Sequence, residues 1–126
     1  MKLKQNEPPR AFEVGHDEKI VMHDCAHALL DPDEQVTLLT EAGAEYDVAR
    51  KDFGFYATPS LNGRLLRFGL RAVLVKNRLD QFFILLVEHG REALFERYVE
   101  SEKLRIVTWL DATERLEELE RRLAGA

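Results

Sequence analysis

The second half of the chain alternates short apolar runs with segments of helical periodicity. Residues 81–88 are apolar on both faces, which is typical of a central strand covered on both sides. Further strands are predicted at 53–57, 70–76 and 104–110, and helices at 59–68 and 91–102. The resulting order over residues 53–110 is strand, helix, strand, strand, helix, strand, which is that of the ferredoxin-like βαββαβ unit.

The first half carries runs of β-forming residues separated by turn residues. Strands are predicted at 19–30, 35–40 and 45–50, divided by turns at residues 31–34 and 41–44. Residues 19–52 are therefore interpreted as an antiparallel β-meander. The preceding residues 1–18, with two prolines and mixed charge, are interpreted as an N-terminal arm.

The last segment, residues 111–124, is predicted to be a helix. Asp111 and Glu114 have the spacing of a capping box. One face repeats leucine and is expected to be buried, at Leu116, Leu119 and Leu123. The chain, residues 1–126, is thus predicted to form a single α+β domain: an N-terminal antiparallel β-meander, a ferredoxin-like βαββαβ unit and a C-terminal helix.

The apolar run at 81–88 has a consequence for assembly. In a ferredoxin-like unit both helices lie on one face of the sheet, so the other face needs a cover. The β-meander or a second copy of the chain could supply this cover. An apolar sheet face left open would exceed the patch size that monomers tolerate, which favours a homodimer.

Composition describes an ordinary globular protein of 126 residues, with 45% hydrophobic and 33% charged residues. No apolar stretch approaches the roughly 18 residues that span a bilayer, and the first residues lack the apolar region of a secretory signal. The single cysteine, Cys25, cannot form an internal disulfide. We therefore expect a cytoplasmic protein with no membrane association.

The net charge of −5 is unevenly distributed. Residues 53–79 contain five basic side chains and no acidic one, whereas acidic side chains are in excess on both sides of this segment. Nucleic-acid affinity comes mainly from neutralising phosphates, so an acidic chain argues against a nucleic-acid partner. The basic segment could still hold a small anion, or it could simply form an exposed charged surface.

Candidate metal ligands lie close together at residues 23–27. On a strand His23, Cys25 and His27 would point to the same face, and imidazole and thiolate groups are ligands for zinc. A straight strand spreads three such ligands too widely for one ion, so a bulge would be needed. Packing of Cys25 as a small buried thiol is the simpler interpretation, and a Cys–His nucleophile is a further alternative.

A second candidate site is the predicted start of the helix at 59–68. Thr58 is placed as its N-cap, and Ser60 and Arg64 follow within the first turn. Free backbone amides, hydroxyl groups and an arginine favour an anion such as a phosphate or carboxylate. The alternative is that Thr58 only caps the helix and Ser60 is a surface residue. The segment lacks the glycine pattern and lysine of a phosphate-binding loop.

Four stretches of the chain, at residues 33–37, 45–65, 68–70 and 72–77, resemble a family of small bacterial proteins with no assigned function. The 45–65 stretch, which runs through Phe53, Gly54 and Thr58–Pro59, is the longest of the four. The resemblance implies a place among genes for surface polysaccharides. It implies no chemistry and supplies no catalytic or ligand residues.

These features lead to two functional hypotheses. The first is a non-enzymatic, self-associating accessory or interaction protein, with no cofactor. The second is a small enzyme that binds an anion or nucleotide sugar through Thr58, Ser60 and Arg64, or a metal through His23, Cys25 and His27.

Overall fold

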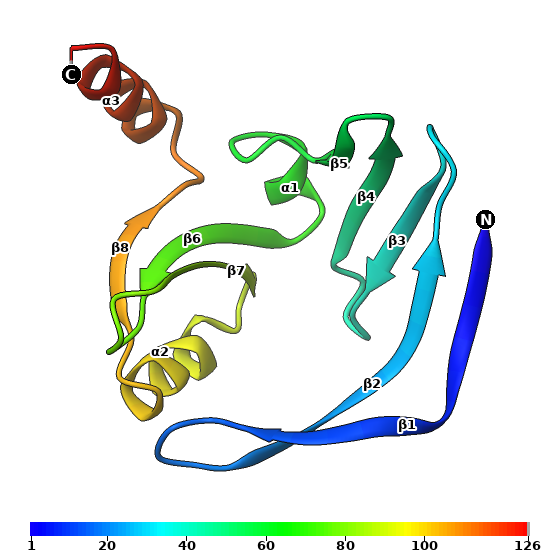
Figure 1. The fold of residues 1–126 in the computed structure, drawn as a ribbon. Coiled ribbons are helices and arrows are strands. Elements are labelled where there is room, and N and C mark those ends of the chain that lie inside the picture. Colours follow the sequence, from blue (N-terminus) through cyan, green and yellow to red (C-terminus); the bar gives the residue numbers. More distant parts are fainter. Residues whose placement is uncertain (126) are drawn as a thin grey trace.

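The computed structural model describes residues 1–125 and shows an α+β protein with antiparallel sheets and a C-terminal helix, as predicted (Figure 1). The strands are β1 (Lys2–Val14), β2 (Ile20–Leu29), β3 (Gln35–Leu39), β4 (Glu45–Lys51), β5 (Gly54–Ala57), β6 (Leu70–Lys76), β7 (Phe82–Glu88) and β8 (Arg105–Trp109). The helices are α1 (Arg64–Arg67), α2 (Glu92–Ser101) and α3 (Thr113–Ala124). The strands form three separate sheets, in the orders β1-β2, β3-β4-β5 and β7-β6-β8.

The first sheet is a long hairpin of β1 and β2 that runs along the lower edge of the molecule toward α2 (Figure 1). The arm predicted for residues 1–18 is therefore wrong in its main part. The pairing register shifts between Gln5 and Arg10, where Pro8 and Pro9 have no N–H to donate. The side-chain amide of Asn6 donates to the carbonyl of Asp24 across this irregular segment.

The β-meander is present, but it consists of β3, β4 and β5 instead of residues 19–52. The cause lies in the turn that follows β2. The backbone N–H of Asp33 donates to the carbonyl of Arg50, and the N–H of Arg50 donates to the carbonyl of Glu34. These bonds hold the start of β3 against β4, so β2 pairs with β1 alone.

The third sheet contradicts the predicted place of residues 81–88. β6 is the central strand, paired with β7 on one side and with β8 on the other, and β7 forms an edge. The first half of β7 is exposed, including Phe82, Phe83 and Ile84. Hydrophobic residues on both faces therefore do not show that a strand is covered on both faces.

The order of elements over residues 53–110 is the predicted one, but the strands are not paired as in a ferredoxin-like sheet. β5 pairs with β4 through the short turn at Asp52 and Phe53. Closing this two-residue turn orders far less chain than pairing β5 with a strand of the third sheet. The local hairpin is formed, and β6 takes the central position.

The core lies around β6. Leu65, Val73 and Val75 have no exposed surface. Ala44, Leu65, Leu70 and Ala72 form one buried cluster, which joins the second sheet to α1 and β6. Phe95 of α2 packs edge-on against Trp109, with ring centroids 5.6 Å apart, in the second cluster.

The predicted helix at 59–68 is shorter than expected. α1 begins at Arg64, and residues 61–63 form a turn instead. Thr58 is not an N-cap, because its hydroxyl is engaged elsewhere; the Ser60 hydroxyl accepts from the Arg64 backbone N–H at 2.9 Å. Gly69, at φ 87°, does end the helix in the left-handed conformation.

α3 differs from its prediction in two ways. Asp111 does not cap it, because the Asp111 carboxylate binds Arg71 at 2.8 Å and Ala112 occupies the cap position. The leucine face is also not buried, and no residue of this helix is. α3 stands apart from the sheets (Figure 1).

Candidate functional site

The predicted anion site is an internal polar cluster built around Asp47 of β4. Asp47 is only 5% exposed. Its carboxylate accepts from the Thr37 hydroxyl at 2.6 Å and lies 3.3 Å from the Arg64 guanidinium. Arg64 also donates to the Thr58 hydroxyl at 2.7 Å, and it lies 5.0 Å from the ring centre of Phe68.

The structure thus brings Thr58, Ser60 and Arg64 together, as the anion hypothesis requires. Arg64, however, is neutralised by Asp47, and the hydroxyls of Thr58 and Ser60 already accept hydrogen bonds from Arg64. An added anion would therefore compete with the buried carboxylate of Asp47 for Arg64. The cluster therefore fits a structural role, holding the loop before α1 against β4.

The predicted metal ligands all lie on β2 and all are exposed. The thiol of Cys25 is 3.4 Å from the carbonyl oxygen of His23, and the imidazole of His27 is 3.6 Å from Asp24. Within residues 1–125, no group of three His, Cys, Asp or Glu side chains is arranged to hold a metal ion. The bulge in the hairpin falls in β1 between Gln5 and Arg10, so it does not bring the three together.

A charged cluster that the sequence did not suggest surrounds Arg71 of β6. Its guanidinium lies 2.8 Å from Asp111 and 3.5 Å from Glu92, and 3.9 Å from the ring centre of Trp109. The hydrogen bond from Arg71 to Asp111 is the first cause of the raised pKa of Arg71. Backbone N–H groups of Glu92 and Gly90, followed by nearby positive charge, lower the pKa of the Glu92 carboxyl.

The Arg71 cluster lines a hollow of about 400 Å³ with Leu66, Leu70 and His89. Arg71 of β6 is paired with Glu92 of α2 and with Asp111 of the segment before α3. In residues 1–125 every buried polar side-chain atom has a hydrogen-bond partner. This cluster too is accounted for by its own internal pairs.

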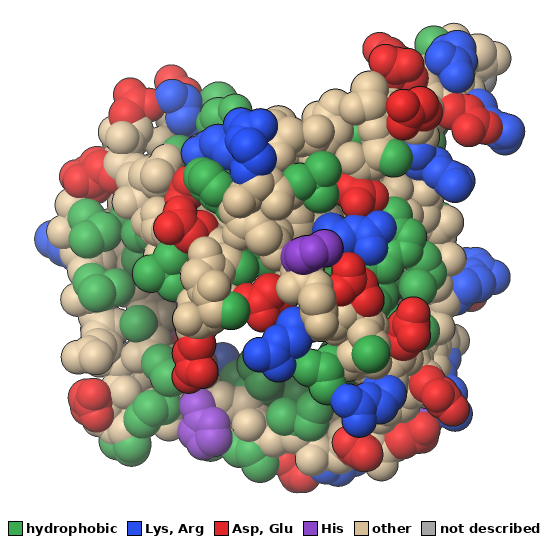
Figure 2. Space-filling model, turned by 180° about the vertical axis from the view of Figure 1, so that it is seen from behind, with side chains coloured by type: hydrophobic (Ala, Val, Ile, Leu, Met, Phe, Trp, Pro, Cys, Tyr) green, Lys and Arg blue, Asp and Glu red, His purple; other side chains and the backbone are tan. Residues whose placement is uncertain are grey.

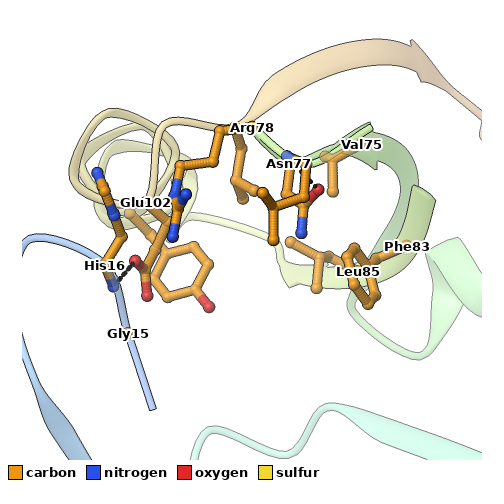
Figure 3. Close-up of a pocket in the computed structure, with 11 residues that line it drawn as sticks. Gly15, His16, Val75, Asn77, Arg78, Phe83, Leu85 and Glu102 are labelled. Atoms are coloured by element: carbon orange, nitrogen blue, oxygen red, sulfur yellow. Dashed lines mark hydrogen bonds between the residues drawn. The ribbon is translucent and has the colours of Figure 1, made fainter. Parts of the chain in front are cut away.

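A pocket lies where the hairpin tip meets α2 and the loop after β6 (Figure 3). Its volume is about 280 Å³, near the lower limit for a small-molecule site. The walls are mainly apolar and come from β6, β7, α2 and the residue before β8: Val75, Phe83, Leu85, Tyr98 and Leu104. His16, Arg78 and Glu102 supply polar groups at the rim (Figure 3).

The polar rim of this pocket serves to dock the hairpin. The backbone N–H of His16 donates to the Glu102 carboxylate at 2.5 Å, and Lys103 lies 3.5 Å from Asp17. Asn77 is engaged by its own loop, since its side-chain oxygen accepts from the backbone of Leu79. The pocket can accept a small apolar group, with the positive charge of Arg78 beside it.

The largest unexplained feature is the amount of apolar surface. Exposed large hydrophobic residues gather on the hairpin, on the turn and strand of β5, and on β7: Leu3, Val21, Met22 and Leu29; Phe53, Phe55 and Tyr56; Phe82, Phe83 and Ile84. Figure 2 shows hydrophobic side chains interspersed with charged ones over one face of the molecule. Each of these groups lies on an outer strand of its sheet.

The total accessible surface is 9330 Å² for a chain of 14.6 kDa. A compact monomer of that mass exposes roughly 6,900 Å², so the excess is about 2,400 Å². Obligate interfaces bury on the order of 2,000–5,000 Å² over both partners. The excess is thus large enough for an obligate interface.

Sequence reasoning missed both the pocket and the extent of this surface. The pocket joins residues 15 and 16 to side chains more than fifty positions later, a proximity that no local pattern encodes. The exposed leucines of α3 do have a local signal, their helical spacing, but spacing does not say what covers them.

No helix within the described residues has the length and apolar character that crossing a membrane would require. Comparisons with protein-family models, with curated proteins and with solved structures found no match. The resemblance to small bacterial proteins therefore stays a prediction.

Proposed function

We propose that this protein is a self-associating interaction module whose folded unit is a homodimer. The observation that carries the proposal is the excess of about 2,400 Å² of accessible surface over a compact monomer. A second copy would cover apolar edge strands that otherwise remain wetted. Unpaired edges of this kind also template further strand pairing, which an isolated chain would have to avoid.

The pairing of the charged side chains favours a protein-binding role over an anion-binding or catalytic one. Arg64 is paired with Asp47, and Arg71 is paired with Asp111 and Glu92. These pairs hold elements together, and they leave neither arginine as a free anion-binding group. The exposed apolar surface, by contrast, has no partner within the chain.

A second copy of the chain is favoured as the partner because every copy exposes the same excess surface. The most common closed assembly is a two-fold dimer, in which the same surface patch is buried on both subunits. A dimer could bury the excess on both chains without any other protein.

Analytical ultracentrifugation of the intact protein tests the proposal. We expect twice the chain mass of 14.6 kDa at micromolar concentration. The midpoint of urea unfolding should rise with protein concentration, because dimerisation stabilises only the folded state. A stable species of single-chain mass, with a concentration-independent midpoint, would contradict self-association.

A further inference from the structure

The C-terminal helix α3 is an amphipathic helix without a partner. Its leucine face comprises Leu116, Leu119 and Leu123, and the last two are 40% and 67% exposed. A groove of about 340 Å³ separates it from β8, lined in part by Val107, Leu110 and Leu119. The helix therefore does not close onto the protein's own sheet.

The leucine spacing is that of a coiled-coil seam. Leu116 and Leu123 are seven residues apart, at consecutive a positions, and Leu119 lies between them at d. In this frame Arg115 and Arg122 occupy g positions and Glu120 occupies an e position. The charges beside the seam set the orientation of the partner helix.

We infer that α3 pairs in parallel with α3 of a second copy, an inference that rests on the proposed self-association. In a parallel pair, g of one helix faces e of the next heptad on the other. Arg115 then meets the partner's Glu120, and the two-fold axis repeats the contact. In an antiparallel pair g faces g, so Arg115 would meet the partner's Arg122 and repel it.

The charge of the helix separates this partner from a membrane surface. α3 carries four acidic residues, Glu114, Glu117, Glu118 and Glu120, against three arginines. Helices that lie on anionic lipid carry an excess of basic residues on the polar face. In Figure 2 α3 projects at the upper right, with positive and negative side chains intermixed.

At 12 residues α3 is too short to pair stably alone, so the pairing is one part of a larger interface. Within that interface it fixes the relative direction of the two chains. The two-fold axis runs parallel to the paired helices. Both β8 strands therefore lie at the same end of the helix pair.

Charge exchange across the seam tests the orientation. Each of Arg115→Glu and Glu120→Arg turns two attractive contacts into repulsive ones and should raise the dimer dissociation constant about tenfold. An equimolar mixture of the two variants restores both attractions and should return to the affinity of the unmodified protein. Arg121→Glu, on the outer face, is the matched control and should change nothing.

Disulfide trapping gives a second measurement. In a Cys25→Ser background, Leu119→Cys should cross-link on oxidation, because d positions face each other in a parallel pair. Arg121→Cys, two residues away on the outer face, should stay uncross-linked. Both positions are exposed in the single chain, so neither substitution threatens folding.

The outcomes separate the two proposals. If the unmodified protein has single-chain mass, self-association itself fails. If it is dimeric but the seam variants behave like Arg121→Glu, self-association stands and the pairing of α3 is overturned. In a third experiment, vesicles of anionic lipid are added to the dimer. If the dimer then dissociates and the backbone amides of α3 become protected from hydrogen exchange, α3 binds a membrane and the helix pairing is overturned.

Discussion

The β7-β6-β8 sheet and the β1-β2 hairpin contain comparable hydrophobic residues with opposite fates. In β6, Ala72, Val73 and Val75 are completely buried. Neither strand of the hairpin has a single buried residue, although each carries several large hydrophobic side chains. The sheet has α2 packed over it through Phe95, whereas the hairpin touches the body mainly at its tip.

This contrast shows that burial requires a second layer and does not follow from hydrophobicity alone. A two-stranded hairpin is marginally stable in water without packing against another element. The hairpin therefore depends on contacts beyond its own backbone pairing, at its tip and, in the proposed dimer, on the second copy.

The largest expected effect is in the core. Phe95→Ala removes the ring packed on Trp109 and should lower the free energy of unfolding by about 3–5 kcal/mol. Leu29→Ala in the hairpin, measured at a protein concentration at which the chain is monomeric, should change it by about 0.5 kcal/mol or less, because Leu29 is mostly exposed in the single chain. Urea denaturation measures both. Equal losses at the two positions would break the comparison.

An intermediate effect is expected at the joint between the second and third sheets. Asp47→Ala leaves Arg64 and Thr37 without their partner and should lower the free energy of unfolding by about 2 kcal/mol. Asp47→Asn, which preserves shape and can still accept from Thr37, should cost less. The same denaturation experiment decides, and an unaffected Asp47→Ala protein would remove the structural role of the cluster.

The smallest effect is expected at the hairpin tip. Glu102→Ala removes the acceptor of the His16 backbone N–H, so the hairpin should open locally more often. Hydrogen exchange of the backbone amides in β1 and β2 should accelerate, while exchange in β6 stays unchanged. If β6 accelerates equally, the hairpin and the sheet form one cooperative unit.

The strand positions could be predicted because their signals are local. The apolar and β-branched residues of β3, β4 and β6, and the turns between them, fall where the structure has them. The pairing of the strands could not be predicted, because it depends on which of several possible turns and hydrogen bonds form. The short turn at Asp52 and Phe53 pairs β5 with β4. The backbone hydrogen bond between Arg50 and Glu34 holds β3 against β4, so β3 does not pair with β2.

The candidate site shows the same limit. The sequence grouped Thr58, Ser60 and Arg64 correctly, since they lie within seven residues of each other. It did not reveal Asp47, which arrives from the neighbouring sheet and neutralises Arg64. A cation's partner decides whether it is a binding group or a structural one, and that partner lay far away along the chain.

By itself the sequence determined the α+β class, the positions of most strands, and the amphipathic C-terminal helix, because each depends on residues close together along the chain. Tertiary structure alone decided that β6 instead of β7 is central, that Arg64 is paired, and that the hairpin and α3 keep their apolar faces exposed. Those outcomes depend on which distant segment covers each surface, and here the chain has too few covering layers for all of them.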